Sequence, residues 1–144
     1  MVYLAADSCG RLSLEMLLDL PPTDNNIYFT RHGGRSLTKE ARKYKSMVKE
    51  STALAAIKCS IPFRENIPYS VNLSLYLNLY SKSWPKKAKW RYKKIDTLNR
   101  TKLLLDALAE AIGVDDRHFT QITVEKEHDE INKRVEVRLT ELWK

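Results

Sequence analysis

At 144 residues the chain is long enough for one domain with a buried core, and its 43% hydrophobic and 30% charged residues are typical of a soluble globular protein. It contains no apolar run long enough to span a membrane, and its two cysteines, Cys9 and Cys59, lack the spacing of a disulfide framework or a zinc site. The 25 Lys and Arg exceed the 18 Asp and Glu by a formal charge of +7, which favours a polyanionic partner because cations placed on phosphates release counterions.

The first half of the chain predicts a strand, a helix and a second strand. Before them, acidic residues interrupt the apolar N-terminal segment, so we expect no secretory signal and a cytoplasmic protein. Residues 11–20 are expected to form a strand that ends at two prolines, and Thr38 can cap a helix that runs to about Lys58. In residues 69–80 apolar side chains occupy every odd position, which indicates a strand with one buried face.

The second half predicts another helix and two more strands. An apolar stripe at helical spacing consists of Leu98, Thr101, Leu104, Leu105, Leu108, Ala111 and Ile112. Asp96 or Thr97 is placed to cap the start of this helix, and Gly113 is placed to end it. Residues 119–126 and 135–142 are expected to be strands joined by a hairpin loop over 128–133. This order predicts a single α+β domain over 1–144, a mixed sheet with two main helices, with residues 1–10 as a candidate flexible extension.

A strongly basic segment precedes the second predicted helix. Its cations, with no acidic residue among them, are Lys82, Lys86, Lys87, Lys89, Arg91, Lys93 and Lys94. Trp84, Trp90 and Tyr92 lie between these cations. Such a segment can follow a phosphate backbone while its rings stack on exposed bases. The alternative is a solvated loop whose aromatic side chains fold back onto the core.

Carboxylates flank the same helix. Asp96 lies where the basic segment meets the helix, Asp106 lies within it, and Asp115 and Asp116 follow it. A polar face opposite the apolar stripe carries Asn99, Lys102, Asp106 and Glu110.

Carboxylates that converge beside a lysine suit phosphodiester hydrolysis. They can hold Mg²⁺, which polarises a phosphoryl oxygen and activates water, while the ammonium group offsets charge in the transition state. The alternative roles are structural. Asp96 would only cap the helix, Lys102 and Asp106 would form an ion pair, and Asp115 with Asp116 would make a turn.

Two motifs resemble the RusA-type Holliday-junction resolvases. The run Asp96-Thr-Leu-Asn-Arg-Thr-Lys-Leu-Leu-Leu-Asp-Ala-Leu108, followed by Asp115-Asp116, is similar to the family's Asp-x-Asp-Asn-x-x-Lys-x-x-x-Asp-Ala-Leu signature and its later Asp-Asp pair. Residues 20–28, with Pro21-Pro22-Thr23-Asp24-Asn25 among them, are similar to the family's Pro-Pro-Ser-x-Asn opening. The resemblance covers residues 17–142, and the two motifs are independent of each other.

The resemblance implies a homodimeric nuclease of DNA recombination and repair that nicks four-way junctions symmetrically with Mg²⁺, or with Mn²⁺ in its place, in a bacterial or phage setting. It places Asp96, Lys102 and Asp116 in the catalytic roles, and Asp96, Asp106, Asp115 and Asp116 around the metal. Asn99 takes the position of the motif's Asn. By charge and location, the further DNA contacts are expected at Arg31, Arg35, Lys86, Lys87, Lys89, Arg91, Lys93 and Lys94.

One position departs from the family pattern. Leu98 stands where the family has its second Asp, and a leucine cannot coordinate a metal. Asp106 or Asp115 can supply the missing metal ligand, which is the interpretation we favour. Alternatively the alignment with the family motif is locally shifted, so that Asp96 matches the second Asp of the motif and Lys94 stands at the position of the first. In the third case the protein is a non-catalytic module that binds DNA or RNA junctions without cutting them. A basic scaffold with no salt-sensitive affinity for nucleic acid is the remaining alternative.

Overall fold

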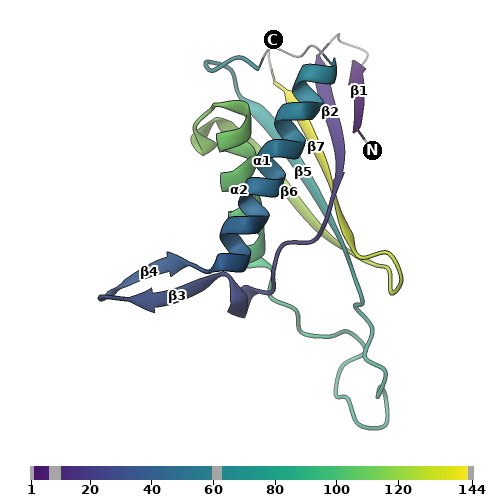
Figure 1. Cartoon of the computed structure of the whole chain (residues 1–144). Helices are drawn as coiled ribbons and strands as arrows, with labels where there is room; N and C mark the ends of the chain where they lie inside the picture. The colour runs from purple at the N-terminus through teal and green to yellow at the C-terminus, as the bar shows by residue number, and fades with distance from the viewer. Residues whose placement is uncertain (1, 7–10, 60–62, 143–144) are drawn as a thin grey trace.

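The computed structural model describes residues 2–6, 11–59 and 63–142, which form an α+β domain with two helices on one face of a mixed sheet (Figure 1). The strands are β1 (Val2–Ala6), β2 (Leu12–Leu18), β3 (Tyr28–Arg31), β4 (Gly34–Leu37), β5 (Tyr69–Leu77), β6 (Phe119–His128) and β7 (Arg134–Glu141), and the helices are α1 (Lys39–Cys59) and α2 (Leu98–Ile112). The main sheet has five strands in the order β1-β2-β7-β5-β6, while β3 and β4 form a separate hairpin that projects from the body. The predicted fold class is confirmed.

The core forms where the alternating apolar strands meet the helices. On β5 the odd-numbered residues are buried, as their alternation predicts. The register places Leu73 of β5 opposite Val137 of β7, which lies opposite Met16 of β2, so neighbouring strands contribute to one apolar row. β5 ends at Leu77, earlier than predicted, and the chain then leaves the sheet.

The second helix lies where it was predicted, but its buried face is different. Leu104, Leu108 and Ile112 are buried as expected, whereas Leu98 is 75% exposed, so its assignment to the core is wrong. The other predicted members of the stripe are only half-buried: Thr101, Leu105 and Ala111. Gly113 ends the helix with φ 73°, the left-handed conformation that glycine adopts without steric cost, as predicted.

The first turn of α2 explains why its buried face differs from the predicted one. Arg100, rather than Leu98, points into the body, and its Nε donates a hydrogen bond of 3.0 Å to the carbonyl oxygen of Pro22. A long cation can be buried there because its polar end finds partners. Leu103 and Ala107, one and two turns further on, are consequently buried as well.

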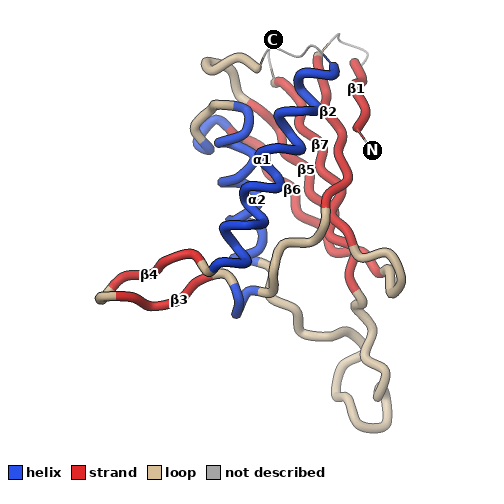
Figure 2. The backbone as a smooth tube through the Cα atoms, in the orientation of Figure 1, coloured by secondary structure: helices blue, strands red, loops and turns tan. Residues whose placement is uncertain are grey.

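The last two strands do not form the predicted hairpin. β5 lies between β7 and β6, so the connection after His128 passes across the end of β5, where the Asp129 N–H donates to the Leu77 carbonyl at 2.9 Å (Figure 2). β5 and β6 are parallel, and parallel neighbours require a crossover, which α2 provides. β7 then returns antiparallel on the other side of β5.

Two further features were not predicted from the sequence. Val2–Ala6, within the candidate flexible extension, pair with β2 as an edge strand, and the β3–β4 hairpin follows the proline motif. Cys9 and the side chain of Cys59 lie outside the described residues. Among the helices that the structure describes, none is long and apolar enough to cross a membrane.

Candidate active site

A cleft of about 490 Å³ lies at the start of α2, and we refer to it as the α2 cleft. Two carboxylates line it, those of Asp24 and Asp96. The basic side chains around them are Lys93, Lys94, Arg100 and Lys133. The proline motif, the end of β5 and the segment before α2 meet here, so the fold unites residues from both sequence motifs.

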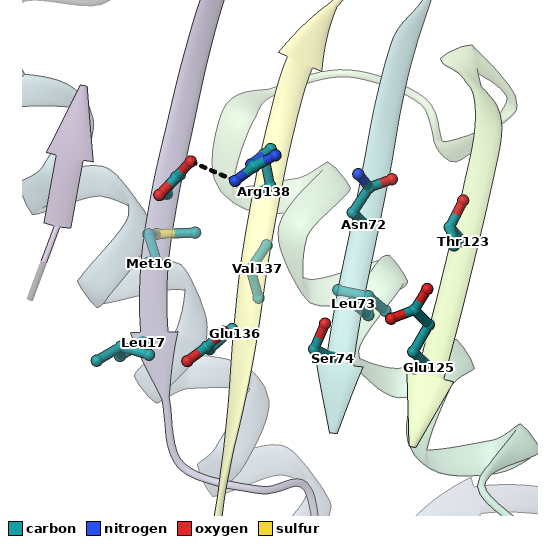
Figure 3. A pocket seen from close by; sticks show the side chains of 11 residues that line it. Met16, Leu17, Asn72, Leu73, Ser74, Thr123, Glu125, Glu136, Val137 and Arg138 are labelled. Carbon is teal, nitrogen blue, oxygen red and sulfur yellow. Dashed lines mark ion pairs between the residues drawn. The ribbon is translucent and has the colours of Figure 1, made fainter. Parts of the chain in front are cut away.

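A second cleft, of about 380 Å³, lies on the face of the sheet that the helices leave open (Figure 3). Three glutamates line it, Glu15, Glu125 and Glu136, against one cation, Arg138, whose guanidinium lies 2.8 Å from Glu15. This acidic excess repels phosphate. Chemistry on a polyanion is therefore expected at the α2 cleft.

Asp24 caps α2 from a distant part of the chain. Its Oδ1 accepts from the backbone N–H of Arg100 at 3.0 Å, and its Oδ2 accepts from that of Asn99 at 3.4 Å. Asp96 accepts from the N–H of Leu98 at 2.9 Å, whereas Thr97, the residue that precedes the helix, makes no side-chain capping bond. Of the two predicted local caps, Asp96 therefore acts and Thr97 does not. Both carboxylates lie at the positive end of the α2 dipole, which stabilises their charge.

Arg100 fixes the proline motif to the helix. Its side chain is only 9% exposed, and its Nε hydrogen bond reaches Pro22, two residues before Asp24. Burial lowers the pKa of the Arg100 guanidinium, and the nearby Asp24 carboxylate opposes that effect. The hydroxyl of Tyr44 donates to the Asp19 carbonyl at 2.7 Å, which ties the same segment to α1. The backbone around Asp24 is thus held by both helices.

We expect Asp24→Ala to lower the free energy of unfolding by about 1 kcal/mol, the usual value of a lost helix cap. The variant leaves two N–H groups of α2 without their acceptor. Urea unfolding followed by circular dichroism measures the change, with Asp24→Asn as the control, because asparagine still offers a capping oxygen. Equal stability of Asp24→Ala and the parent would show that the cap contributes nothing.

The basic loop, residues 82–94, stands away from the core. Trp84, Trp90 and Tyr92 are 46%, 56% and 56% exposed, so the alternative in which the aromatic residues fold back onto the core is wrong. The base of the loop is closed by two backbone hydrogen bonds of 2.7 Å, from Ser81 N–H to the Arg91 carbonyl and from Lys93 N–H to that of Leu79. These hydrogen bonds fix the base of the loop, and its three rings are exposed beyond that base.

Of the remaining predicted carboxylates, Asp106 lies in the middle of α2, and Asp115 and Asp116 follow its far end. Asp106 is half-buried, and burial, reinforced by the charge of Asp116, raises its pKa. Asp115 accepts from the Arg117 N–H at 3.0 Å, and this hydrogen bond holds the pKa of Asp115 below its usual value. Asp115 thus has a turn-forming role, which the sequence analysis gave as the alternative to metal binding.

Asp96 and Asp116 do not meet within one chain. α2 has 15 residues, and a helix of that length is about 22 Å long. The strand positions agree with this separation. Leu77, which lines the α2 cleft, lies at one end of β5. β6, which follows Asp116, begins beside Tyr69, at the opposite end of β5. Within residues 2–6, 11–59 and 63–142 no three His, Cys, Asp or Glu side chains form a group that could hold a metal ion.

A family model for the endodeoxyribonuclease RusA matches residues 19–140, which is most of the chain. The chain belongs to the RusA endodeoxyribonuclease family. No curated protein matches it directly. Every residue that lines the α2 cleft falls inside the region that the RusA model matches. The predicted family is confirmed, and with it membership in a family of DNA-cutting enzymes.

In this RusA-family chain, the predicted DNA contacts surround the α2 cleft. Lys93 and Lys94 line the cleft, and the half-buried Asn99 lies in the first turn of α2. The predicted contacts Lys86, Lys87, Lys89 and Arg91 are exposed on the basic loop, and Arg31 and Arg35 are exposed on the hairpin. Both the loop and the hairpin extend from the end of the molecule where α2 begins (Figure 1). Their assignment to DNA stays a prediction.

Sequence reasoning did not identify Asp24 as a site residue. It occupies the variable position of the proline motif, and its contact with α2 spans 76 residues of sequence. No local spacing could reveal such a contact. Leu98, at the position of the RusA motif's second Asp, is exposed beside Asp96, so the missing carboxylate has not been replaced by a buried packing residue.

Proposed function

We propose that the chain is a metal-dependent endodeoxyribonuclease that resolves four-way DNA junctions by paired symmetric nicks. The observation that carries the proposal is the position of Asp96, in a cleft with Lys93 and Lys94 at the base of two basic projections. Family membership supplies the reaction class. The charge around Asp96 supplies the reason for a polyanionic substrate to enter there.

Carboxylate oxygens are the donors that Mg²⁺ and Mn²⁺ take in phosphodiester hydrolysis. Asp96 would be the principal ligand, and a metal bound there would polarise the scissile phosphate and activate water. Lys93 and Lys94 would position the phosphate, and Lys102, one turn along α2 from Leu98 and exposed, would offset charge on the departing oxygen. Asp24 is a weaker candidate ligand, because both of its oxygens already accept from helix amides.

Among the residues of one chain that the structure describes, the donor set is incomplete, and we propose that a second copy completes it. A twofold axis that relates two antiparallel α2 helices would bring Asp96 of one protomer beside the partner's Asp116, which lies at the opposite end of its own helix. Exposed apolar side chains on α2 and β6 offer area for such contact: Leu98, Ile122 and Val124. Two such sites in one dimer suit the cutting of two strands of a symmetric junction.

Incubation of a labelled four-way junction with Mg²⁺, beside a linear duplex of the same sequence, tests the activity. Paired nicks at symmetric positions of the junction, with the duplex left intact, are expected. Cleavage of both substrates at similar rates would contradict junction selectivity. Binding of the junction without nicks in either Mg²⁺ or Mn²⁺ would favour the second candidate, a non-catalytic junction-binding protein.

This second candidate rests on a specific observation. Leu98 presents an exposed apolar side chain where the family motif has a carboxylate, directly beside Asp96. If no partner carboxylate replaces the missing ligand, the cleft would hold phosphate without hydrolysing it.

Replacing Lys86, Lys87 and Lys89 together by alanine should weaken binding to all DNA forms and reduce the salt dependence of affinity. All three side chains are exposed on the basic loop. Loss of three phosphate contacts should lower the slope of log K against log salt by about 2 to 3. Fluorescence anisotropy over a salt series measures this slope. An unchanged slope would show that the basic loop does not contact the backbone.

A further inference from the structure

We propose that the β3–β4 hairpin is a groove-reading arm that enters the major groove of a duplex arm beside the α2 cleft. The inference rests on the proposed function, since it names how the nuclease engages its DNA. It concerns sequence preference and not the chemistry of cutting.

The hairpin is a fixed ribbon. Its strands pair in a continuous register from Tyr28 opposite Leu37 to Arg31 opposite Gly34. The turn residues His32 and Gly33 have φ of 48° and 77°, and two positive φ values in a tight turn match the twist of the strands.

The base of the hairpin is held just as firmly. The Thr38 N–H donates to the Ile27 carbonyl at 2.9 Å, and Ile27 itself is fully buried. Tyr28 and Leu37 are partly buried against the core. The ribbon thus projects from a rigid root into solvent (Figures 1 and 2).

The two faces of the ribbon differ. On one face Tyr28 packs towards the core, and the Arg35 guanidinium lies 4.3 Å from the centre of its ring, a cation–π contact that orients the arginine. On the other face, by strand alternation, lie Phe29 and Arg31. Phe29 is 40% exposed and Arg31 is exposed, so an apolar ring and a cation are presented together.

The charge and width of the hairpin fit DNA. From Asn25 to Lys39 the chain contains no acidic residue, and it carries Arg31, Arg35 and Lys39. The major groove, about 12 Å wide, admits a two-stranded ribbon without deformation of the duplex, whereas entry into the minor groove, about 6 Å wide, requires that the duplex be bent and the groove widened. In the major groove an arginine can donate to guanine N7 and O6, and an apolar ring can contact the thymine methyl group. Phe29 and Arg31 are one such pair.

Dimethyl sulfate protection of a four-way junction tests the proposal, because the reagent methylates guanine N7 in the major groove and adenine N3 in the minor groove. The footprint is taken with chelator present, so that no strand is cut. The parent protein should protect guanine N7 positions in the arms next to the branch point. The double variant Phe29→Ser, Arg31→Ala should lose that protection and bind about tenfold more weakly, a loss on the scale of one base contact.

Arg138→Ala is the matched control. It also removes one exposed arginine, but from the open face of the sheet, away from the hairpin. It should leave the footprint unchanged. Guanine protection that survives in the double variant, or protection of adenine N3 in its place, would overturn the proposal while leaving the nuclease function standing. Junction binding by the parent, measured by gel shift, reports the proposed function separately, and its absence would overturn both.

Discussion

Replacing Asp96 by asparagine should reduce junction cleavage by roughly 100-fold or more, the scale on which loss of one charged group at a reacting centre is felt. Asparagine keeps the shape of the side chain and still offers an oxygen to the Leu98 N–H, so the start of α2 should remain folded. It removes the negative charge that makes Asp96 a metal ligand. Because Lys93 and Lys94 line the same cleft, where only Asp24 then remains as a carboxylate, their attraction for phosphate should be less opposed, and junction binding should stay equal or become tighter.

Gel shift in chelator and single-turnover cleavage in Mg²⁺ separate the two effects. Asp19→Asn is the matched control, since Asp19 is an exposed carboxylate one residue before Leu20, which lines the cleft. It makes the same change of charge near the α2 cleft without touching the proposed ligand. Cutting by Asp96→Asn at the parental rate would mean that the metal lies elsewhere.

The parts of the fold that depend on nearby residues were predictable. The alternation in β5 and the stop at Gly113 both act within a few residues, and both appear in the structure. The buried face of α2 was partly mispredicted because a tertiary contact, Arg100 with Pro22, decides which side of the first turn points inward. Leu98 has the hydropathy of a core residue but no partner there.

The pairing of the last strands was also mispredicted from local sequence. The short polar connection after β6 is typical of a hairpin, yet β5 lies between the strands that it joins. The β3–β4 hairpin carried a local signal, the glycine pair Gly33-Gly34, whose first residue lies in the turn and whose second begins β4.

The sequence indicated which motif residues are candidates for the site, and their roles stay a prediction; it did not predict how these residues are arranged in space. Its motif residues were found from their spacing, and so was their order along α2. Their separation could also have been calculated, because a helix of 15 residues keeps its two ends apart. Asp24 could not have been found this way, since only the folded chain brings it to α2.

Two heterodimers that carry the same pair of substitutions should differ in activity if each site uses Asp96 of one protomer and the partner's Asp116. In the first, one chain carries Asp96→Asn and the other carries Asp116→Asn. One composite site then loses both carboxylates, and the other keeps both. This heterodimer should nick one strand at about half the parental rate, because one of its two symmetry-related sites is intact.

In the second heterodimer, one chain carries both substitutions and the other chain is unchanged. Each composite site then lacks one carboxylate, so neither should cut. If each chain held its own complete site, the result would be reversed, since only the unchanged chain of the second heterodimer would work. Purification through two different affinity tags isolates each pair, and a plasmid with an extruded cruciform gives the readout. Paired nicks linearise the plasmid, whereas single nicks only relax it. Open circles from the first heterodimer and untouched plasmid from the second are therefore the expected result. The opposite pattern would show that each metal site lies within a single chain.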